Sequence, residues 1–219
     1  MNPEIIFEDS DLLVLDKPAG LIVHEGHGQT DATLVDWLKT RYPKSPLSEE
    51  RYGLLHRLDK DTSGLILVAK TLAAFKYYKK LFKQRAITKQ YLALVHGRLT
   101  PTRGLIQIPL ARGLVNRTRF EPATSGRSAE TEYNVETYYP QFTYLSVWPK
   151  TGRTHQIRVH FASLGHPIVG DKVYGKPDAF TRQFLHAHRL DFIDQKGKNC
   201  KFISPLPADL DQFLRNLSR

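Results

Sequence analysis

The sequence changes repeatedly between the two-residue hydrophobic period of β-strands and the 3.6-residue period of α-helices, without a regular strand–helix–strand rhythm. Strand patterns are predicted at residues 5–7, 12–15, 65–69, 90–96, 127–139, 144–148, 184–193 and 201–203. Helix patterns are predicted around residues 34–38, 72–85, 155–164 and 210–217. This mixture favours an α+β fold, with a mixed, mainly antiparallel sheet and flanking helices, over a doubly wound sheet. Because no linker-like stretch divides the chain, we expect a single domain over residues 1–219.

Two local patterns refine this outline. Thr30 or Asp31 is the expected N-cap of the first helix, because hydroxyl and carboxylate oxygens accept hydrogen bonds from the free amides of a first turn. Residues 112–128 are polar and show neither period, so they are the best candidate for a mobile loop.

Positive charge is concentrated in the middle of the chain. The 32 Lys and Arg residues exceed the 22 Asp and Glu residues, which gives a formal net charge of +10. No acidic residue occurs between residues 62 and 120, and a region of one sign this long predicts a polyanionic partner such as RNA. The predicted helix at residues 72–85 supplies the candidate phosphate contacts Lys76, Lys79, Lys80, Lys83 and Arg85. Most aromatic residues among these cations are expected in the core.

Several classes of protein and site are disfavoured. The single cysteine, Cys200, permits neither a disulfide framework nor a thiolate metal cluster, and with no signal-peptide pattern we expect a cytoplasmic protein. The pairs His24/His27 and His186/His188 resemble fragments of metal sites, but without further ligands we interpret them as ordinary polar histidines and expect no metal. Phosphate-binding glycine loops and acyl-transfer motifs are also missing.

Three segments carry candidate chemistry: HRLDKDTSG at residues 56–64, KQYLALVHG at 89–97 and PKTGRTHQIRVHFASLGHPIVGD at 149–171. In the first, Asp59 lies among cations that favour its ionised form, as a nucleophile requires. Charge spacing alone favours a plainer interpretation, in which Asp59 or Asp61 caps a turn or pairs with an arginine. Similarly, Tyr91 alone indicates a core tyrosine and Arg153 alone a surface ion pair.

Taken together and in this order, the segments closely resemble the RluA family of pseudouridine synthases. The resemblance rests on His56–Asp59 with Thr62–Gly64, Lys89–Tyr91, Thr151–His160, Gly165–Ile168 with Gly170–Asp171, the early Asp16–Gly20 loop and the late Leu185–Ala187 segment. It covers nearly the whole chain. It implies the pseudouridine synthase fold with a central RNA-binding cleft, and an isomerase that needs no metal or organic cofactor.

The resemblance also implies roles for particular residues. Asp59 would be the catalytic nucleophile, Tyr91 would stack on the flipped uracil, and Arg153 would pair with Asp59 and keep it charged. Arg57 would enter the space that the flipped base leaves. The remaining candidate RNA contacts in the three segments are His56, Lys89, His155 and Arg158.

The partner is expected to be structured RNA, with ribosomal RNA of the large subunit as the first choice and transfer RNA as the alternative. Many relatives carry an S4-type RNA-binding domain before the catalytic domain. Here the catalytic pattern starts within the first residues, so we expect a stand-alone catalytic domain and a monomer. Two rival functions are a non-catalytic RNA-binding module and a metal-dependent hydrolase that uses the histidine pairs.

Overall fold

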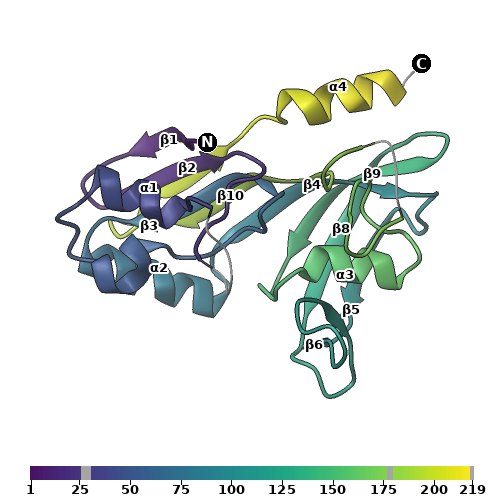
Figure 1. Ribbon diagram of the computed structural model, residues 1–219, viewed down its shortest axis with the longest axis horizontal. Helices are drawn as coiled ribbons and strands as arrows, with labels where there is room; N and C mark the ends of the chain where they lie inside the picture. The colour runs from purple at the N-terminus through teal and green to yellow at the C-terminus, as the bar shows by residue number, and fades with distance from the viewer. Residues whose placement is uncertain (26–30, 177–179, 218–219) are drawn as a thin grey trace. The chain divides into compact units, whose positions relative to one another are not determined.

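The computed structural model describes residues 1–25, 31–176 and 180–217 of the chain (Figure 1). The chain divides into two compact units, Met1–Thr88 with Ala187–Ser204 and Lys89–His186 with Pro205–Arg219. The expectation of one catalytic domain over residues 1–219 stays a prediction.

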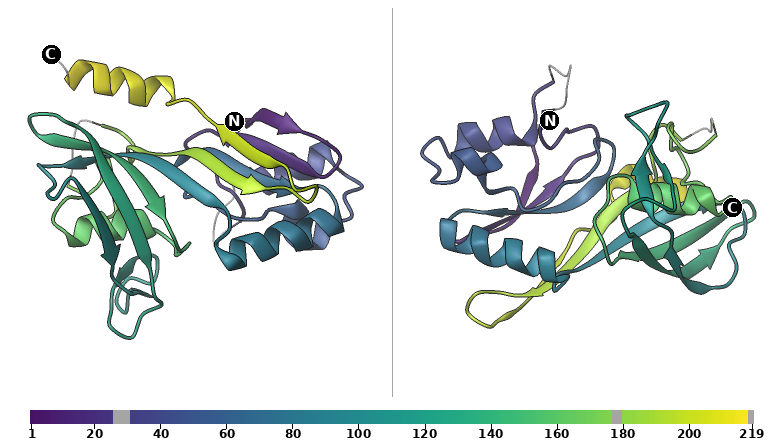
Figure 2. Two further views of the ribbon diagram at one scale, coloured as in Figure 1. Left: turned by 180° about the vertical axis from the view of Figure 1, so that it is seen from behind. Right: turned by 90° about the horizontal axis from the view of Figure 1, so that it is seen from below.

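The first unit is built on antiparallel strands completed by a segment from late in the chain. Its strands are β1 (Glu4–Glu8), β2 (Leu12–Lys17), β3 (Ser63–Ala69), β10 (Leu185–Ile193), whose first two residues belong to the second unit, and β11 (Asn199–Ile203). β2 pairs antiparallel with both β1 and β3, and β10 forms an antiparallel hairpin with β11, coloured yellow-green in Figure 2. Every residue of β3 is buried, as the all-apolar run at residues 65–69 predicts for most of it.

The helices of this unit are α1 (Leu34–Arg41), the short 3-10 helix η1 (Ser48–Gly53) and α2 (Leu72–Gln84). α1 is capped by Thr33, whose side chain accepts from the Asp36 amide at 3.2 Å. The cap is therefore neither Asp31 nor Thr30, which lies outside the described residues. α2 places Phe75 and Tyr78 in a core with Leu65, Leu67 and Leu190, as its apolar spacing predicts.

The second unit contains a four-stranded antiparallel arrangement in the order β4-β9-β8-β5. The strands are β4 (Thr88–His96), β5 (Arg103–Gln107), β8 (Glu130–Tyr138) and β9 (Phe142–Pro149). α3 (Gln156–Ser163) lies beside β8, and α4 (Ala208–Leu217) closes the chain (Figure 1). Phe161, Phe184, Leu210 and Leu214 share one core with Leu94 and Leu145.

A small hairpin occupies part of the stretch that lacks periodicity. β6 (Leu110–Arg112) pairs antiparallel with β7 (Phe120–Pro122). Three-residue strands are too short to show a two-residue period, which is why the sequence pattern indicates only a loop here. Among the described residues, no helix is long and apolar enough to cross a membrane.

Candidate active site

Asp59 lies in a tight turn held against strand β3. The preceding segment runs along this strand: the Leu55 amide donates to the Leu67 carbonyl at 3.2 Å, and the Leu67 amide donates to Nε2 of His56 at 3.0 Å. Leu58 is buried while Arg57 is exposed and Asp59 half-buried. The Thr62 amide then donates to the Asp59 carbonyl at 3.1 Å and closes the turn. These hydrogen bonds hold the backbone of Asp59 in place, four residues before β3 begins at Ser63.

The buried side chain of Lys17 also holds the Asp59 turn. Lys17 has no exposed surface, and its ammonium donates to the carbonyls of Pro18, Leu21 and Lys60 at 2.9, 2.8 and 2.9 Å. The Gly20 amide also donates to the Lys60 carbonyl, at 2.9 Å. The Asp16–Gly20 loop, recognised in the sequence as a motif, therefore anchors the residue that follows Asp59. Sequence reasoning did not single out Lys17, because a lone lysine gives no signal of burial.

Gly64 explains the last residue of the Thr62–Gly64 motif. Its φ is +113°, and a Cβ atom at this position would lie 2.3 Å from the carbonyl oxygen of Ala187 in β10. No other residue type tolerates that contact, because the obstacle is backbone. The neighbouring Asp16 is opposite Leu65 and accepts a 2.5 Å hydrogen bond from the Ser204 hydroxyl, while burial raises the pKa of the Asp16 carboxyl.

His24 lies near two arginines of the first unit. Burial lowers the pKa of the His24 imidazole, and the nearby charges of Arg57 and Arg51 lower that pKa further. His24 is therefore neutral near pH 7 and adds no charge to those of the two guanidinium groups. His27 lies outside the described residues.

Tyr91 and Lys89 lie on strand β4 of the second unit. Tyr91 is opposite Val147 of β9, and its half-buried ring packs against the main core of this unit. Lys89, two residues earlier and also half-buried, shares its face of the strand. The intervening Gln90 points the other way and donates to the Ser146 hydroxyl at 2.9 Å.

Arg153 occupies a corner whose shape is set by Gln156, the first residue of α3. Oε1 of Gln156 accepts from the Thr151 hydroxyl at 2.6 Å and from the Arg153 amide at 3.0 Å. Its Nε2 donates to the Glu130 carbonyl at 2.9 Å and the Thr131 hydroxyl at 3.0 Å. The half-buried Arg153 side chain donates from Nε to the Ser128 carbonyl at 3.1 Å.

Arg158 lies in the interior of the second unit. It is 5 % exposed, and its guanidinium donates to the buried Asp171 carboxylate through Nε at 2.7 Å and Nη2 at 2.8 Å. The Arg158 guanidinium, together with the Val173 and Tyr174 amides, outweighs burial and lowers the pKa of Asp171. This two-pronged pair holds α3 to the Gly170–Asp171 segment. A structural role therefore describes Arg158 better than the phosphate contact expected from sequence.

The basic residues of α2 have the expected arrangement. Lys76, Lys79, Lys80 and Lys83 are exposed at helical spacings of three and four, so they form one stripe. Lys79 lies 3.6 Å from the Glu50 carboxylate and above the Phe75 ring, so an acidic residue outside the 62–120 stretch offsets part of this charge. Arg85 is exposed just beyond the helix.

The predicted catalytic residues come from both units: Asp59 from the first, Tyr91 and Arg153 from the second. Their mutual contact stays a prediction. Within the described residues, no group of three or more His, Cys, Asp or Glu side chains is placed to hold a metal ion. The expectation of a metal-free reaction likewise stays a prediction.

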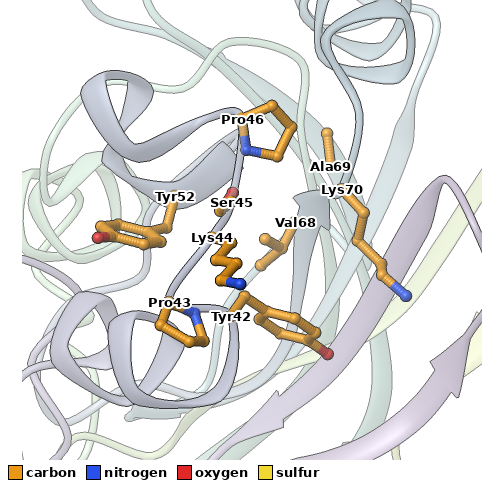
Figure 3. Close-up of a pocket in the computed structure, with 9 residues that line it drawn as sticks. All are labelled: Tyr42, Pro43, Lys44, Ser45, Pro46, Tyr52, Val68, Ala69 and Lys70. Carbon is orange, nitrogen blue, oxygen red and sulfur yellow. The ribbon is translucent and has the colours of Figure 1, made fainter.

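A pocket of about 350 Å³ lies against Val68 and Ala69, the last residues of β3 (Figure 3). Tyr42, Tyr52 and two prolines line it with Val68 and Ala69. Because β3 spans seven residues, the Asp59 turn lies roughly 20 Å away along the strand. We therefore do not identify this pocket with the active site.

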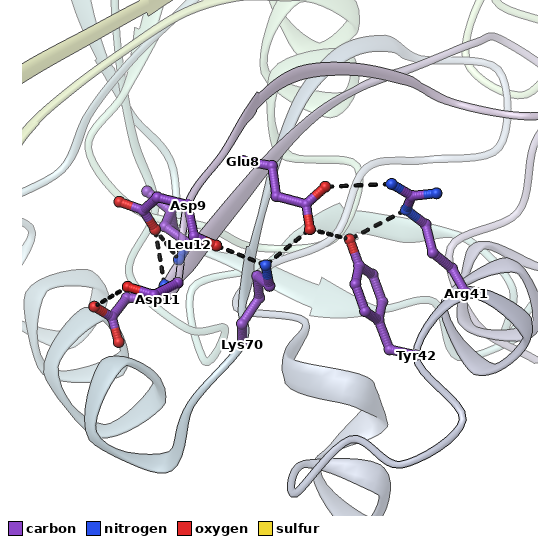
Figure 4. Close-up of polar contacts among 8 residues, drawn as sticks. Glu8, Asp9, Asp11, Leu12, Arg41, Tyr42 and Lys70 are labelled. Atoms are coloured by element: carbon purple, nitrogen blue, oxygen red, sulfur yellow. Dashed lines mark hydrogen bonds and ion pairs between the residues drawn. The ribbon is translucent and has the colours of Figure 1, made fainter.

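Tyr42 and Lys70 join this pocket to an ionic cluster around Glu8 (Figure 4). Glu8 accepts hydrogen bonds from Lys70 Nζ and the Tyr42 hydroxyl, both at 2.8 Å, and Arg41 lies 3.4 Å away. The hydrogen bond from Lys70, followed by that from Tyr42, lowers the pKa of Glu8 to about 2.

Comparison with known proteins places these features in a family. The family model described as RNA pseudouridylate synthase matches residues 11–163, a range that contains Asp59, Tyr91 and Arg153. The chain belongs to this family. The match confirms the resemblance seen in the sequence.

Individual members of the pseudouridylate synthase family match over almost all of the chain. Ribosomal large subunit pseudouridine synthase D of Nitrosomonas europaea is 42% identical, over 98% of this chain and 66% of that protein. The synthase of the same name from Vibrio cholerae is 39% identical, over 94% of this chain and 68% of that protein. An uncharacterized RNA pseudouridine synthase of Chloroflexus aurantiacus is 43% identical, over 92% of this chain and 65% of that protein. The chain thus spans about two thirds of the length of these relatives.

Solved structures confirm the predicted α+β pseudouridine synthase fold. Human RNA Pseudouridylate Synthase Domain Containing 1 superposes with a TM-score of 0.78 and 28% identity, over 99% of this chain and 95% of that one. Human RNA Pseudouridylate Synthase Domain Containing 4 gives a TM-score of 0.80 at 23% identity, over 98% of this chain and 92% of that one, and at this identity supports the fold alone.

Proposed function

We propose that this protein isomerises uridine to pseudouridine in structured RNA, with Asp59 as the catalytic residue. The observation that carries the proposal is the placement of Asp59, in a turn whose backbone is held by Thr62 and by the Lys17 clamp at Lys60. A catalytic carboxylate needs this fixed geometry, because small displacements from the reacting atoms cost much of the rate. The family match over residues 11–163 supports the reaction type.

The reaction exchanges one bond of the nucleotide for another. The bond between N1 of uracil and C1′ of ribose breaks with the help of Asp59, the base turns within the site, and a bond forms between C5 and C1′. The C5 proton leaves and N1 gains a proton, so atoms balance and no second substrate is consumed. Because a stacked uridine is out of reach, the target base must first leave the helix, at a cost of a few kcal/mol.

Other residues have roles in this proposal by their match to the family motifs. Arg57, exposed beside Asp59, fills the space left by the base, and Tyr91 stacks on the uracil. Arg153 pairs with Asp59 and orients it. The lysines of α2 position the RNA through its phosphates without reading sequence.

Large-subunit ribosomal RNA is the substrate that we propose, in the cytoplasm where ribosomes are assembled. Its support is the name shared by the Nitrosomonas and Vibrio relatives, ribosomal large subunit pseudouridine synthase D. Transfer RNA remains the alternative. Mapping of pseudouridines by carbodiimide treatment and reverse transcription, in cells with and without the gene, decides between them: a site lost from transfer RNA alone would refute the ribosomal assignment.

The activity is tested by Asp59→Asn. Formation of the C5–C1′ bond releases the hydrogen at C5, so RNA made with [5-³H]uridine reports turnover as tritium in water. We expect Asp59→Asn to lose at least about a thousandfold in rate, because the amide cannot act as a nucleophile. The matched control is Asp61→Asn in the same turn, which should retain activity. Full tritium release by Asp59→Asn would reject the mechanism, and a wild-type protein that binds RNA without release would be a non-catalytic binding module.

A further inference from the structure

The hydroxyl of Tyr174 contacts both strand β7 and His155, the residue that precedes helix α3. Its oxygen accepts a hydrogen bond from the Phe120 amide at 2.8 Å and lies 2.9 Å from Nδ1 of His155. His155 is the N-cap of α3 and follows Arg153 by two residues. One phenol oxygen therefore links the β6–β7 hairpin to the corner that carries Arg153.

Tyr174 itself is firmly held. Its backbone amide donates to Oδ1 of Asp171 at 3.1 Å, and Asp171 is fixed by the two-pronged pair with Arg158. The Tyr174 ring lies beneath two guanidinium carbons, those of Arg119 and Arg158, each 5.2 Å from its centre. The buried Arg158–Asp171 ion pair therefore also holds the backbone of Tyr174, and so helps to place its hydroxyl.

The phenol oxygen can satisfy both partners at once. The Phe120 amide must donate, so it occupies one lone pair of the oxygen. The other lone pair and the phenol hydrogen remain for Nδ1 of His155, so the contact forms with either tautomer of the imidazole.

The backbone conformation of His155 explains why a hydrogen bond to its side chain matters. His155 has φ +56° and ψ 15°, the left-handed conformation that is costly for a residue with a Cβ atom. The side chain of His155 makes no capping hydrogen bond to its own helix. The contact with Tyr174 therefore helps to hold a strained residue at the start of α3, immediately after the Thr151–Arg153 turn.

We propose that Tyr174 is a positioning residue for the isomerisation. Its hydroxyl holds the His155 side chain beside the β6–β7 hairpin and, through His155, keeps the Arg153 corner in its working geometry relative to β7. The proposal rests on the proposed function, in which Arg153 acts on Asp59. Nothing in it requires Tyr174 to touch the RNA.

The test is Tyr174→Phe, which keeps the ring that both guanidinium groups contact and removes only the hydroxyl. The matched control is Tyr138→Phe in the same unit, whose hydroxyl donates to the Leu99 carbonyl at 2.8 Å. For Tyr174→Phe we expect kcat for tritium release to fall about tenfold, the equivalent of one hydrogen bond, with KM changed less than about threefold. Tyr138→Phe should leave kcat unchanged.

Nitrogen-15 NMR of the histidine rings provides a readout that does not depend on turnover. The His155 signals are assigned by their loss in His155→Gln. Loss of the hydroxyl in Tyr174→Phe should shift the Nδ1 signal of His155 near pH 7.5, because the 2.9 Å contact is removed. An Nδ1 signal that is identical in Tyr174→Phe and the wild type would overturn the proposal.

Each kinetic outcome also decides the question. A lower melting temperature for Tyr174→Phe with unchanged kcat would show that the residue is only structural and would overturn the proposal. A fall in kcat that Tyr138→Phe matches would overturn it too. An inactive wild-type protein would instead reject the proposed function, and the positioning role would fall with it.

Discussion

Lys17 shows how one residue can matter to a site without reaching it. Its ammonium has no contact with water, and removing an ion from water costs several kcal/mol unless its hydrogens find strong acceptors. Three carbonyl oxygens at 2.8–2.9 Å meet this need, and one of them belongs to the residue after Asp59. The buried charge is therefore well stabilised only while the turn that carries Asp59 keeps its geometry.

Replacement of this lysine should consequently affect both stability and rate. Lys17→Met keeps most of the side-chain volume but removes the ammonium donor from the three carbonyls, of which that of Lys60 keeps the Gly20 amide as a donor. We expect the free energy of unfolding to fall by about 2–4 kcal/mol and kcat to fall as well. Urea denaturation and tritium release measure the two effects, with the exposed Lys44→Met as control. Equal stability of the two variants would contradict the clamp.

Glu8 makes the stability of the first unit depend on pH. Its pKa is about 2 in the folded protein and 4.5 when unperturbed, so the unfolded chain takes up a proton first as the pH falls. The stabilisation is complete above pH 4.5 and disappears as the pH drops from 4.5 towards 2. Above pH 4.5 it amounts to about 1–2 kcal/mol after allowance for solvent screening.

Glu8→Gln tests this dependence. The variant should unfold more easily than the wild type at pH 7, and the difference should shrink steadily below pH 4.5, as measured by urea denaturation at each pH. Glu4→Gln, an exposed residue of the same strand, is the control. A difference between Glu8→Gln and wild type that stays constant down to pH 3 would contradict the assigned pKa.

Chemical roles of single residues were only partly accessible from sequence. Resemblance supplied Asp59, Tyr91 and Arg153, whereas spacing alone favoured a turn cap, a core residue and a surface ion pair. Arg158 shows the reason: a sequence does not say that Asp171 will lie 2.7 Å away in the interior. Lys17 and Tyr174 escaped notice because their importance comes from partners distant in the chain.

Among the elements, helix α2 was the most predictable. Its apolar positions and its lysine stripe both follow the helical period, and Thr71 caps it by accepting from the Ala74 amide at 3.2 Å. Only its end differs, because the helix stops at Gln84 and Arg85 adopts a left-handed conformation with φ +59°. Glycine is the usual residue there, and an arginine gives no sequence signal for it.

Arg85→Gly should therefore stabilise the protein. Relief of the left-handed conformation at this C-terminal position is worth about 1 kcal/mol, or roughly 2–4 °C in melting temperature for a chain of this size. Arg85→Ala is the control, because it removes the same side chain but keeps the Cβ atom and the strain. Scanning calorimetry compares the two, and a melting temperature for Arg85→Gly no higher than that of Arg85→Ala would refute the assignment.

Shorter elements were less accessible. The β6–β7 hairpin has strands of three residues, and its position depends on two contacts with a distant segment rather than on its own pattern. Its Phe120 amide donates to the Tyr174 hydroxyl, and its Arg119 guanidinium donates to the Val173 carbonyl. The N-cap of α1 was misplaced because several hydroxyl and carboxylate residues precede the helix. Thr33 prevails since Asp36 completes a reciprocal pair of cap hydrogen bonds with it.

For the whole molecule, the net charge of +10 predicts RNA binding that weakens steeply with salt. Exposed Lys80 and Lys83 are the best test within α2, since Glu50 already offsets Lys79. The double variant Lys80→Ala/Lys83→Ala should lower the slope of log K against log salt by about 1.5 in filter-binding assays. Lys196→Ala/Lys198→Ala removes the same charge from the β10–β11 turn and should leave the slope nearer the wild-type value. Equal slopes for both variants would show a diffuse charge effect instead.

The division of the chain into two units could not be predicted from the pattern of its sequence. The first unit needs Leu190 and Phe192 from β10 to complete its core, although β1, β2 and β3 end before residue 88. No linker marks the first two boundaries because the chain crosses them inside β4 and β10. Composition and periodicity therefore predicted the fold class correctly but not its subdivision.

Gln156 has a consequence for how the Arg153 corner can vary. The two ends of its side-chain amide differ: Oε1 only accepts hydrogen bonds, and Nε2 only donates them. Two of its four partners donate to Oε1 and two accept from Nε2. Glutamate has nearly the same shape, yet it would turn an oxygen towards the Glu130 carbonyl and add an uncompensated charge. At this corner, then, the difference between NH₂ and oxygen outweighs size and shape, and the smallest change in atoms is among the least tolerable.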